Sequence, residues 1–476
     1  MAANQNPYTI PPGLMGALTN FFYAAAPRPV PEIALAAAIG FMAGVCGRAY
    51  NTSGTGLIQY ILVVAPTGTG KSAIASGTDK LINAIRNDVP SAELFIGPGV
   101  FASGPALLKY IASTSNCFVT MQGEFGLTLQ AMTSPRASAH LVQLKQALLD
   151  LYSKSGAGEV LRASQYSQKE NSTPAVESPA VSLIGEGTPE TVFGPLNETS
   201  ITDGLLPRFL LIEYKGPRVP LQENRIVAPW PELANDLKTL TSHAHKQMHN
   251  RNVIDVQPDY EARRIFKDFG EKCDRRINDA DTGSVKELWN RAYLKVVRLA
   301  ALVAVGVNPF EPTITATEAL WAIGIEEANI NNLLSRFECG EVGDQTDDNA
   351  RVNKLREIIN AYFERSSSEF TSKSLLPLQE HRKAGVIPER YLFQRTNTVT
   401  AFKNARQGAR LALKSAIEQL ISFGEIVRVP NKQLPNFTAS HAALYALAEE
   451  STALNGKMKA AISQRRQIQK LFEDAS

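Results

Sequence analysis

One segment constrains the fold of this chain more than any other: a glycine-rich stretch between an apolar run and a helix-compatible run. Ile58–Val64 is apolar, residues 65–72 read Ala-Pro-Thr-Gly-Thr-Gly-Lys-Ser, and a helix-compatible run continues to Ile82. A strand, a glycine turn and a helix in this order predict a phosphate-binding loop, because successive backbone N–H groups and the positive helix end surround an anion. The segment matches the Walker A pattern except that Ala65 replaces the first glycine. The alternative is a glycine-rich turn that arose by chance.

The chemistry of such a loop gives its side chains distinct roles. We expect Lys71 to reach the β and γ phosphate oxygens of ATP and Ser72 to ligate Mg²⁺. ATP and Mg²⁺ are therefore the predicted cofactors. The predicted ATP-binding residues of the loop are Pro66, Thr67, Gly68, Thr69, Gly70, Lys71 and Ser72.

The chain around this loop alternates between strand-like and helical segments. The strand-like runs are Leu57–Val64, Glu93–Ile96, Cys117–Met121, Ala180–Ile184 and Phe209–Tyr214. Such alternation predicts an α/β fold with a parallel sheet and crossover helices. From about residue 229 apolar residues recur at three- and four-residue spacing, so an all-helical region should follow.

The C-terminal part has a different pattern. Helical runs at Val352–Arg365 and Val399–Phe423 precede a short strand, Glu425–Val429, which is compatible with a winged helix. The predicted segments are a helical lead-in (1–50), a P-loop ATPase core (51–227), a helical lid-like domain (228–340), a winged-helix nucleic-acid-binding domain (350–440) and a basic tail (441–476).

Composition fits a globular protein of several domains. The chain has 476 residues, of which 44% are apolar and 20% charged, with a formal net charge of +3. That charge argues neither for nor against a polyanionic partner. The four cysteines are widely spaced and are expected to be reduced thiols. The most apolar run, Ile33–Cys46, is too short to cross a bilayer, so we predict a cytoplasmic protein with no membrane segment.

ATP hydrolysis at a phosphate loop needs an acidic residue at the end of a neighbouring strand. Residues 117–124 read Cys-Phe-Val-Thr-Met-Gln-Gly-Glu, which makes Glu124 the candidate general base; an exposed glutamate at a strand end has the same pattern. Many such enzymes carry Asp-Glu here, whereas this chain has Gly123 before Glu124. Either Ser72, water and the phosphates suffice for the metal, or Glu124 serves both tasks.

Two further strand ends carry polar residues that phosphoryl transfer could use. Residues 180–190 end a strand with Glu186 and Thr188, of which Thr188 is the first choice for a γ-phosphate sensor. Arg208 stands at the start of the last apolar run, where it is the candidate arginine finger for the next subunit's site. An ordinary polar strand end is the alternative in both cases.

Together these motifs resemble a known family. The chain is similar to phage- and plasmid-encoded P-loop ATPases described as replicative DNA helicases, which are RecA/AAA+-like ring ATPases. The resemblance covers roughly residues 25–340. Besides the Walker A segment it rests on residues 122–126 (Gln-Gly-Glu-Phe-Gly), Thr188–Glu190, residues 203–209 (Asp-Gly-Leu-Leu-Pro-Arg-Phe) and residues 288–300, which begin Leu-Trp-Asn-Arg-Ala-Tyr.

The resemblance implies a ring-forming, hexameric motor with ATP at the subunit interfaces and nucleic acid in the central channel. It also implies that Arg291 and Lys295, one helical turn apart, contact ATP as a second sensor. Solvated charges on an amphipathic helix are the alternative. A phage-encoded protein of this kind would act in the cytoplasm of its bacterial host.

Two basic segments are candidates for contact with single-stranded nucleic acid. The first is the polar insertion 153–178, and the second is the helix predicted over 399–423, where four basic residues at spacings of three, four and four share one face. Such groups would neutralise phosphates, and an aromatic ring could stack on a base. A surface loop and a solvated helix face are the alternatives. The candidate residues are Lys154, Arg162, Tyr166, Lys169, Lys403, Arg406, Arg410 and Lys414.

The leading hypothesis is an ATP-driven hexameric DNA helicase or translocase that works with replication proteins. A DNA-binding helicase loader or replication-initiation regulator, which uses ATP to switch conformation, is the second, and Gly123 favours it slightly. A small-molecule kinase is disfavoured because long helical and basic segments follow the core. The only histidine cluster, His243, His245 and His249, has no carboxylate or thiol placed to complete a metal site.

Overall fold

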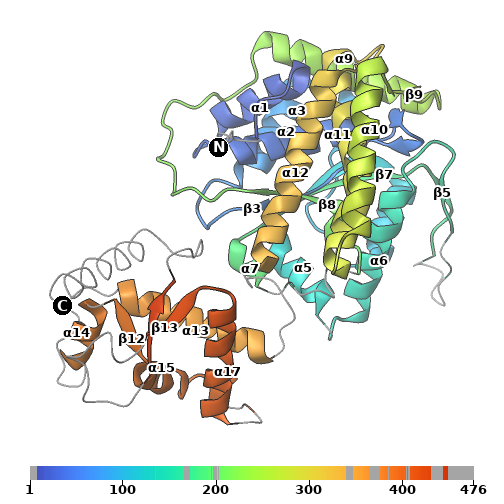
Figure 1. The fold of residues 1–476 in the computed structure, drawn as a ribbon. Coiled ribbons are helices and arrows are strands. Elements are labelled where there is room, and N and C mark those ends of the chain that lie inside the picture. The colour runs from blue at the N-terminus through green and yellow to red at the C-terminus, as the bar shows by residue number, and fades with distance from the viewer. Residues whose placement is uncertain are drawn as a thin grey trace. The chain divides into compact units, whose positions relative to one another are not determined.

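The computed structural model forms two compact units, residues 1–336 and 337–476 (Figure 1). The predicted lead-in, ATPase core and helical region therefore lie almost entirely within one unit. The residues that the structure describes are 8–448 except 135, 164, 166–171, 195, 197–200, 202, 339–346, 365–375, 384, 404, 406–407 and 430–442.

The first unit is built on a four-stranded parallel sheet. The strand order is β4 (Cys117–Gln122), β7 (Ala180–Gly187), β3 (Tyr60–Val64) and β8 (Phe209–Glu213). Every residue of β3 and β8 is buried, which is typical of a parallel sheet covered on both faces. The α/β fold with a parallel sheet, predicted from the alternating runs, is confirmed.

One of the five predicted strands is wrong. Residues Pro90–Phe95 form a 3-10 helix, η1, and only Ile96 pairs with the sheet, through a single parallel bridge to Val119. Proline lacks an N–H for a strand ladder and has the φ angle of a first helical turn, so Pro90 starts a helix here.

Helix α2 (Pro31–Cys46) packs directly on the sheet, next to helix α1 (Gly13–Ala25). All its residues from Ile33 onward are buried. Glycines allow the close approach: a Cβ at Gly40 would lie 2.3 Å from the Ile184 side chain. Helix α2 therefore forms a layer of the α/β core and is more than a lead-in to it.

The rest of the first unit is mainly helical. Short strands interrupt it: β9 (Ile254–Asp255) pairs with β1 (Tyr50–Thr52), and β10 (Gln257–Pro258) pairs with β11 (Thr313–Ile314). The region is therefore not all-helical, because it also pairs with the N-terminal segment. In the part of the chain that is described, no helix is long and apolar enough to span a membrane. The helices are α9 (Pro231–His249), α10 (Tyr260–Asn278), α11 (Gly283–Val307) and α12 (Ala316–Glu338).

Side chains from α11 and α12 satisfy the outer edge of β8. Lys295 is buried, forms an ion pair of 2.7 Å with Glu326, and donates to the backbone oxygen of Phe209 at 3.2 Å. Asn329 accepts a hydrogen bond of 3.0 Å from the Leu211 N–H. Unpaired backbone groups on a buried edge strand would be costly. These contacts therefore fix the helical region to the sheet.

The second unit combines helices with a small antiparallel sheet of order β12-β14-β13. The helix predicted over 399–423 is broken: α16 ends at Lys403, α17 begins at Ala409, and Gly408 between them has a φ of +85°. The elements are α13 (Asp347–Glu364), α14 (Leu376–Lys383), β12 (Val386–Pro388), α15 (Glu389–Thr396), α16 (Thr400–Lys403), α17 (Ala409–Ser422), β13 (Ile426–Val429) and β14 (Leu444–Leu447).

The buried ion pair gives a test of the fold. Lys295→Ala should lower the free energy of unfolding by about 3–5 kcal/mol, because it leaves the buried Glu326 carboxylate without its partner. Lys286→Ala, at an exposed site on the same helix, is the control and should change it by less than about 0.5 kcal/mol. Urea denaturation measures both. Equal stability of the two variants would contradict the buried pair.

Candidate nucleotide-binding site

Residues 65–72 connect β3 to helix α3 (Ala73–Ile85). Gly68 and Gly70 have φ angles of +77° and +93°, which other residues rarely adopt. A Cβ at Gly70 would also lie 2.9 Å from the backbone oxygen of Arg28. Both glycines are therefore required by the path of the loop, which is what an anion-binding backbone needs.

Lys71 is folded back onto the loop. Its Nζ donates to the backbone oxygens of Ala65 at 2.7 Å and Pro66 at 3.3 Å. Burial lowers the pKa of Lys71, and the nearby charges of Glu186 and Glu124 oppose that shift. Ser72 occupies the N-cap of α3 and makes no side-chain capping bond there. A long ammonium side chain and a hydroxyl thus flank the helix end where a phosphate would bind.

Two carboxylates face this loop from neighbouring strand ends. Glu186 lies in β7 in register with Val63 of β3, and Glu124 follows the end of β4 with a φ of +54°. Burial raises the pKa of Glu186. The positive charge of Lys71 opposes this rise, and the negative charge of Glu124 adds to it. The expected acidic strand is therefore not adjacent to β3: β7 lies between them. The structure nevertheless places Glu124 within electrostatic range of Lys71.

Thr188 lies one residue beyond β7 and caps helix α7 (Pro189–Phe193). Its hydroxyl accepts from the Thr191 N–H at 3.4 Å, and the Thr191 hydroxyl accepts from the Thr188 N–H at 3.0 Å. Glu190 has a lowered pKa, first because of a hydrogen bond from Thr188. The predicted sensor therefore stands beside the loop with its hydroxyl engaged in a helix cap.

Gly123 is not imposed by packing. A Cβ there would meet no atom within 4 Å, and the residue has no positive φ. The chain has room for the acid that many P-loop ATPases carry at this position. The absence of that acid reflects the sequence and not a steric limit of the fold.

Arg208 lies at the opposite end of the sheet from the loop. It directly precedes β8, which runs parallel to β3 with Phe209 beside Tyr60 and Glu213 beside Val64. The phosphate loop begins after Val64, whereas Arg208 is level with the start of β3. Arg208 therefore cannot contact a nucleotide held by its own loop.

The second-sensor assignment of Arg291 and Lys295 needs correction. Lys295 is buried against Glu326 and bonds to the oxygen of Phe209, so it is level with the start of β8. Arg291 lies one helical turn from Lys295 and within electrostatic range of Arg208, whose pKa is lowered first by burial and then by the Arg291 charge. Neither residue lines its own phosphate loop. Sequence spacing placed them on one helix face but could not show where α11 docks.

The predicted nucleic-acid residues are only partly described. Lys154 forms an ion pair of 2.6 Å with Glu159, and Arg162 is exposed. Between them lies β5 (Val160–Leu161), which pairs with β6 (Val176–Glu177). Tyr166, Lys169 and Arg406 fall outside the described residues.

In the second unit Lys403, Arg410 and Lys414 are exposed, but Lys403 belongs to α16 and the other two to α17. The predicted single stripe of four residues is therefore wrong, because the chain turns at Gly408. Among the described residues, no three or more His, Cys, Asp or Glu side chains are grouped so that they could hold a metal ion. Three of the four cysteines, Cys46, Cys117 and Cys273, are described, and all are buried and unpaired.

Two arginines beside the loop were missed. Arg28 presses its backbone against Gly70, and Arg218 donates from Nε to the oxygen of Gly68 at 3.2 Å. Both lie in irregular, proline-containing segments, Pro27–Pro29 and Gly216–Pro220. Proline-rich context marks a turn but gives no clue to which distant segment the turn contacts.

No protein-family model matches the chain, and no curated protein matches it. Among solved structures, one similarity is to "Structure of the Aeropyrum Pernix ORC2 protein (ADPNP-ADP complexes)". Identity is 12%, 89% of this chain and 91% of that chain are covered, and the TM-score is 0.24. A similarity at this level says nothing about the activity of this chain.

The two carboxylates can be separated by substitution. Glu124→Gln should keep ATP binding but lower hydrolysis by about a hundredfold or more, since an amide cannot take a proton from water. Glu186→Gln removes the same charge within β7 and should retain most of the hydrolysis. Steady-state phosphate release and equilibrium binding are measured for both. The reverse ranking would identify Glu186 as the base.

Proposed function

We propose that this protein is a Mg²⁺-dependent ATPase. The proposal rests on one observation: Lys71, Glu124 and Glu186 lie within electrostatic range of one another at the carboxyl ends of β3, β4 and β7. In this scheme the loop amides and Lys71 hold the phosphates, Ser72 helps to hold Mg²⁺, and Glu124 activates water. Thr188 senses the γ-phosphate from the end of β7.

We further propose that the complete site forms between copies of the chain, in a hexameric ring. Arg208 carries a fixed charge at the end of the sheet remote from its own loop, and the charge of Arg291 acts on it there. Two guanidinium charges in one region attract an anion, and the triphosphate of a neighbouring copy is one. Arg208 then acts as an arginine finger in trans.

The substrate we propose is single-stranded DNA, which the motor moves along or unwinds during phage or plasmid replication. The polar insertion with Lys154 and Arg162 would lie toward the channel. We propose that the second unit is a winged-helix domain; its elements follow the order α13-α14-β12-α15-α16-α17-β13-β14, and its sheet has the order β12-β14-β13. Its helix α17 buries one face and exposes Arg410 and Lys414 on the other. Phosphate contacts from such a face give affinity without sequence preference.

A helicase loader or initiation switch is the second candidate, favoured by Gly123. Sustained ATP turnover stimulated by single strands, together with strand separation, supports the motor. Slow hydrolysis without unwinding supports the switch.

A mixing experiment tests the composite site. Arg208→Ala should bind ATP normally and hydrolyse it on the order of a thousandfold more slowly, as for other arginine fingers. Lys71→Ala should lose hydrolysis because Lys71 is the one positively charged residue within the loop, residues 65–72. Mixed rings should regain activity, since one copy supplies Arg208 and the next supplies Lys71. Rings that assemble from both variants without regaining activity would contradict the trans role.

The charged face of α17 has its own test. If Arg410 and Lys414 each contact one phosphate, the double glutamine variant should reduce the slope of log affinity against log salt by about 1.4 on single-stranded DNA. The loss should be similar across sequences. Lys354→Gln, on α13 in the same unit, is the control and should leave the slope unchanged. An unchanged slope in the double variant would make this an ordinary solvated face.

A further inference from the structure

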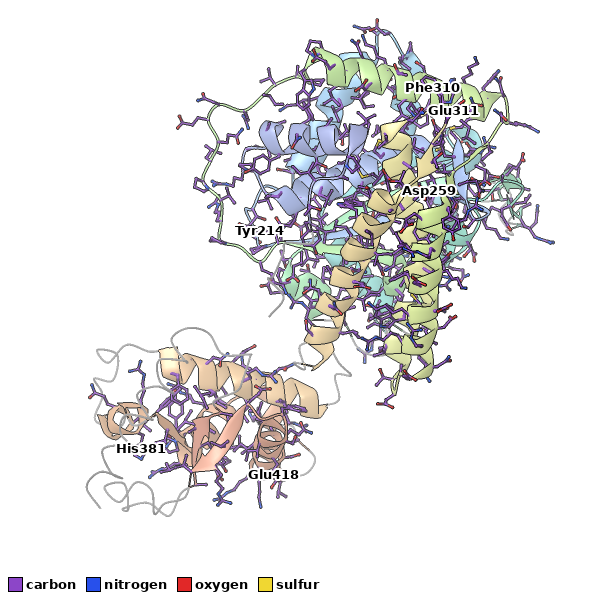
Figure 2. All side chains as sticks on the ribbon, turned by 45° about the horizontal axis from the view of Figure 1, so that its top comes forward. Tyr214, Asp259, Phe310, Glu311, His381 and Glu418 are labelled. Carbon is purple, nitrogen blue, oxygen red and sulfur yellow. The ribbon has the colours of Figure 1, made fainter. Side chains whose placement is uncertain are left out.

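The segment between β8 and α9, residues 214–227, has no regular secondary structure and is called the strap below. It leaves the sheet beside the phosphate loop, because the Tyr214 N–H donates to the oxygen of Val64 at 2.9 Å. The Tyr214 hydroxyl then donates to the oxygen of Pro217 at 2.6 Å, which turns the chain just before Arg218. Figure 2 labels Tyr214, and Figure 1 shows the strap looping along the outside of the first unit.

The strap is pinned to the connection between α1 and α2. Gln222 donates from its backbone N–H to the oxygen of Pro27 and from its side chain to that of Ala24, each at 2.8 Å. The Arg28 guanidinium donates to the oxygen of Val219. Since Arg28 also touches Gly70, one set of contacts joins the strap, the α1–α2 connection and the phosphate loop.

These contacts hold Arg218 over the open face of Gly68. Its Nε donates to the Gly68 oxygen at 3.2 Å, and a Cβ at Gly68 would lie 3.4 Å from the same nitrogen. The side chain is exposed, and no carboxylate forms an ion pair with it in the described part of the chain. Arg218 is thus a cation at the loop with a single neutral hydrogen-bond acceptor.

The side chains of Arg218 and Lys71 are held in the same way. Each is a long cationic side chain that rests on backbone oxygens of the loop, and each can turn toward an anion bound there. A guanidinium binds a phosphate through two parallel hydrogen bonds, which are stronger than its bond to a neutral carbonyl. The helix α11 residues expected to supply a second cation in cis lie at the other end of the sheet.

We propose that Arg218 is a second cationic ligand of the nucleotide phosphates, supplied by the same chain as the loop. This inference rests on the proposed binding of ATP. Arg28 is a positioning residue for it, because its guanidinium holds the strap and its backbone contacts the loop.

Equilibrium titration of the full chain with ATP and Mg²⁺ tests the assignment. Arg218→Ala should weaken ATP binding by about tenfold or more, the usual worth of a hydrogen-bonded charge pair. Arg218→Lys should restore part of the loss, since it returns the charge without the paired bonds. Arg225→Ala is the matched control: Arg225 is exposed on the same strap, near Lys80 in the third turn of α3. It should bind ATP like the parent, and thermal unfolding should be alike for all variants.

The outcomes separate this inference from the proposed function. If the parent chain does not bind ATP, the proposed function fails. If the parent binds ATP, Lys71→Ala does not, and Arg218→Ala binds within twofold of the parent, only the role of Arg218 is overturned. If Arg218→Ala and Arg225→Ala weakened ATP binding equally, the role of Arg218 would also be overturned. The loss would then reflect the net charge of the strap and not a contact made by Arg218.

Discussion

The parallel pairing of β3 between β7 and β8 determines where every chemical group of the site lies. In a parallel sheet the carboxyl ends of all strands lie at the same end of the sheet, so Lys71, Glu186 and Glu124 come together there. The same pairing places Arg208 at the opposite end of the sheet, where the strands begin. Five residues at about 3.3 Å each put roughly 16 Å of strand between Arg208 and the loop, which exceeds the reach of one side chain.

The edge of β8 ties this sheet to the helices around it. Near the loop, the buried Glu213 carboxylate accepts hydrogen bonds from Asn332 at 2.8 Å and from Arg336, both on α12. The Arg336 guanidinium also lies 3.7 Å from the centre of the Phe193 ring on α7. The helix that Thr188 caps is thereby joined through one arginine to the last turn of α12. At the far end, Lys295 serves the same purpose, which explains why a lysine predicted to bind ATP is structural.

Local signals in the sequence predicted the parts of the site that are themselves local. The order of strand, glycine turn and helix determined the phosphate loop, since its conformation depends on neighbours within a few residues. Four of the five β-branched or apolar runs form strands, and Pro90 explains why the fifth does not. The break between α16 and α17 lies at Gly408, whereas the predicted helix over 399–423 rested on the spacing of its apolar and basic residues.

Contacts between distant segments could not be predicted in this way. Nothing in residues 117–124 indicates that β7 separates β4 from β3. The position of α11 depends on the ion pair between Lys295 and Glu326 of α12. In that position Arg291 lies away from the phosphate loop, where it was expected. Arg28 and Arg218 reach the loop through irregular segments whose course is set by tertiary hydrogen bonds.

We propose that two copies of the chain complete one ATP site. An electron cryomicroscopy structure with a non-hydrolysable ATP analogue, Mg²⁺ and single-stranded DNA tests it most directly. We expect a ring in which Arg208 of one copy lies within hydrogen-bonding distance of the γ-phosphate held by Lys71 of the next. A nucleotide-bound chain that stays monomeric, or a ring with Arg208 directed away from every nucleotide, would contradict it.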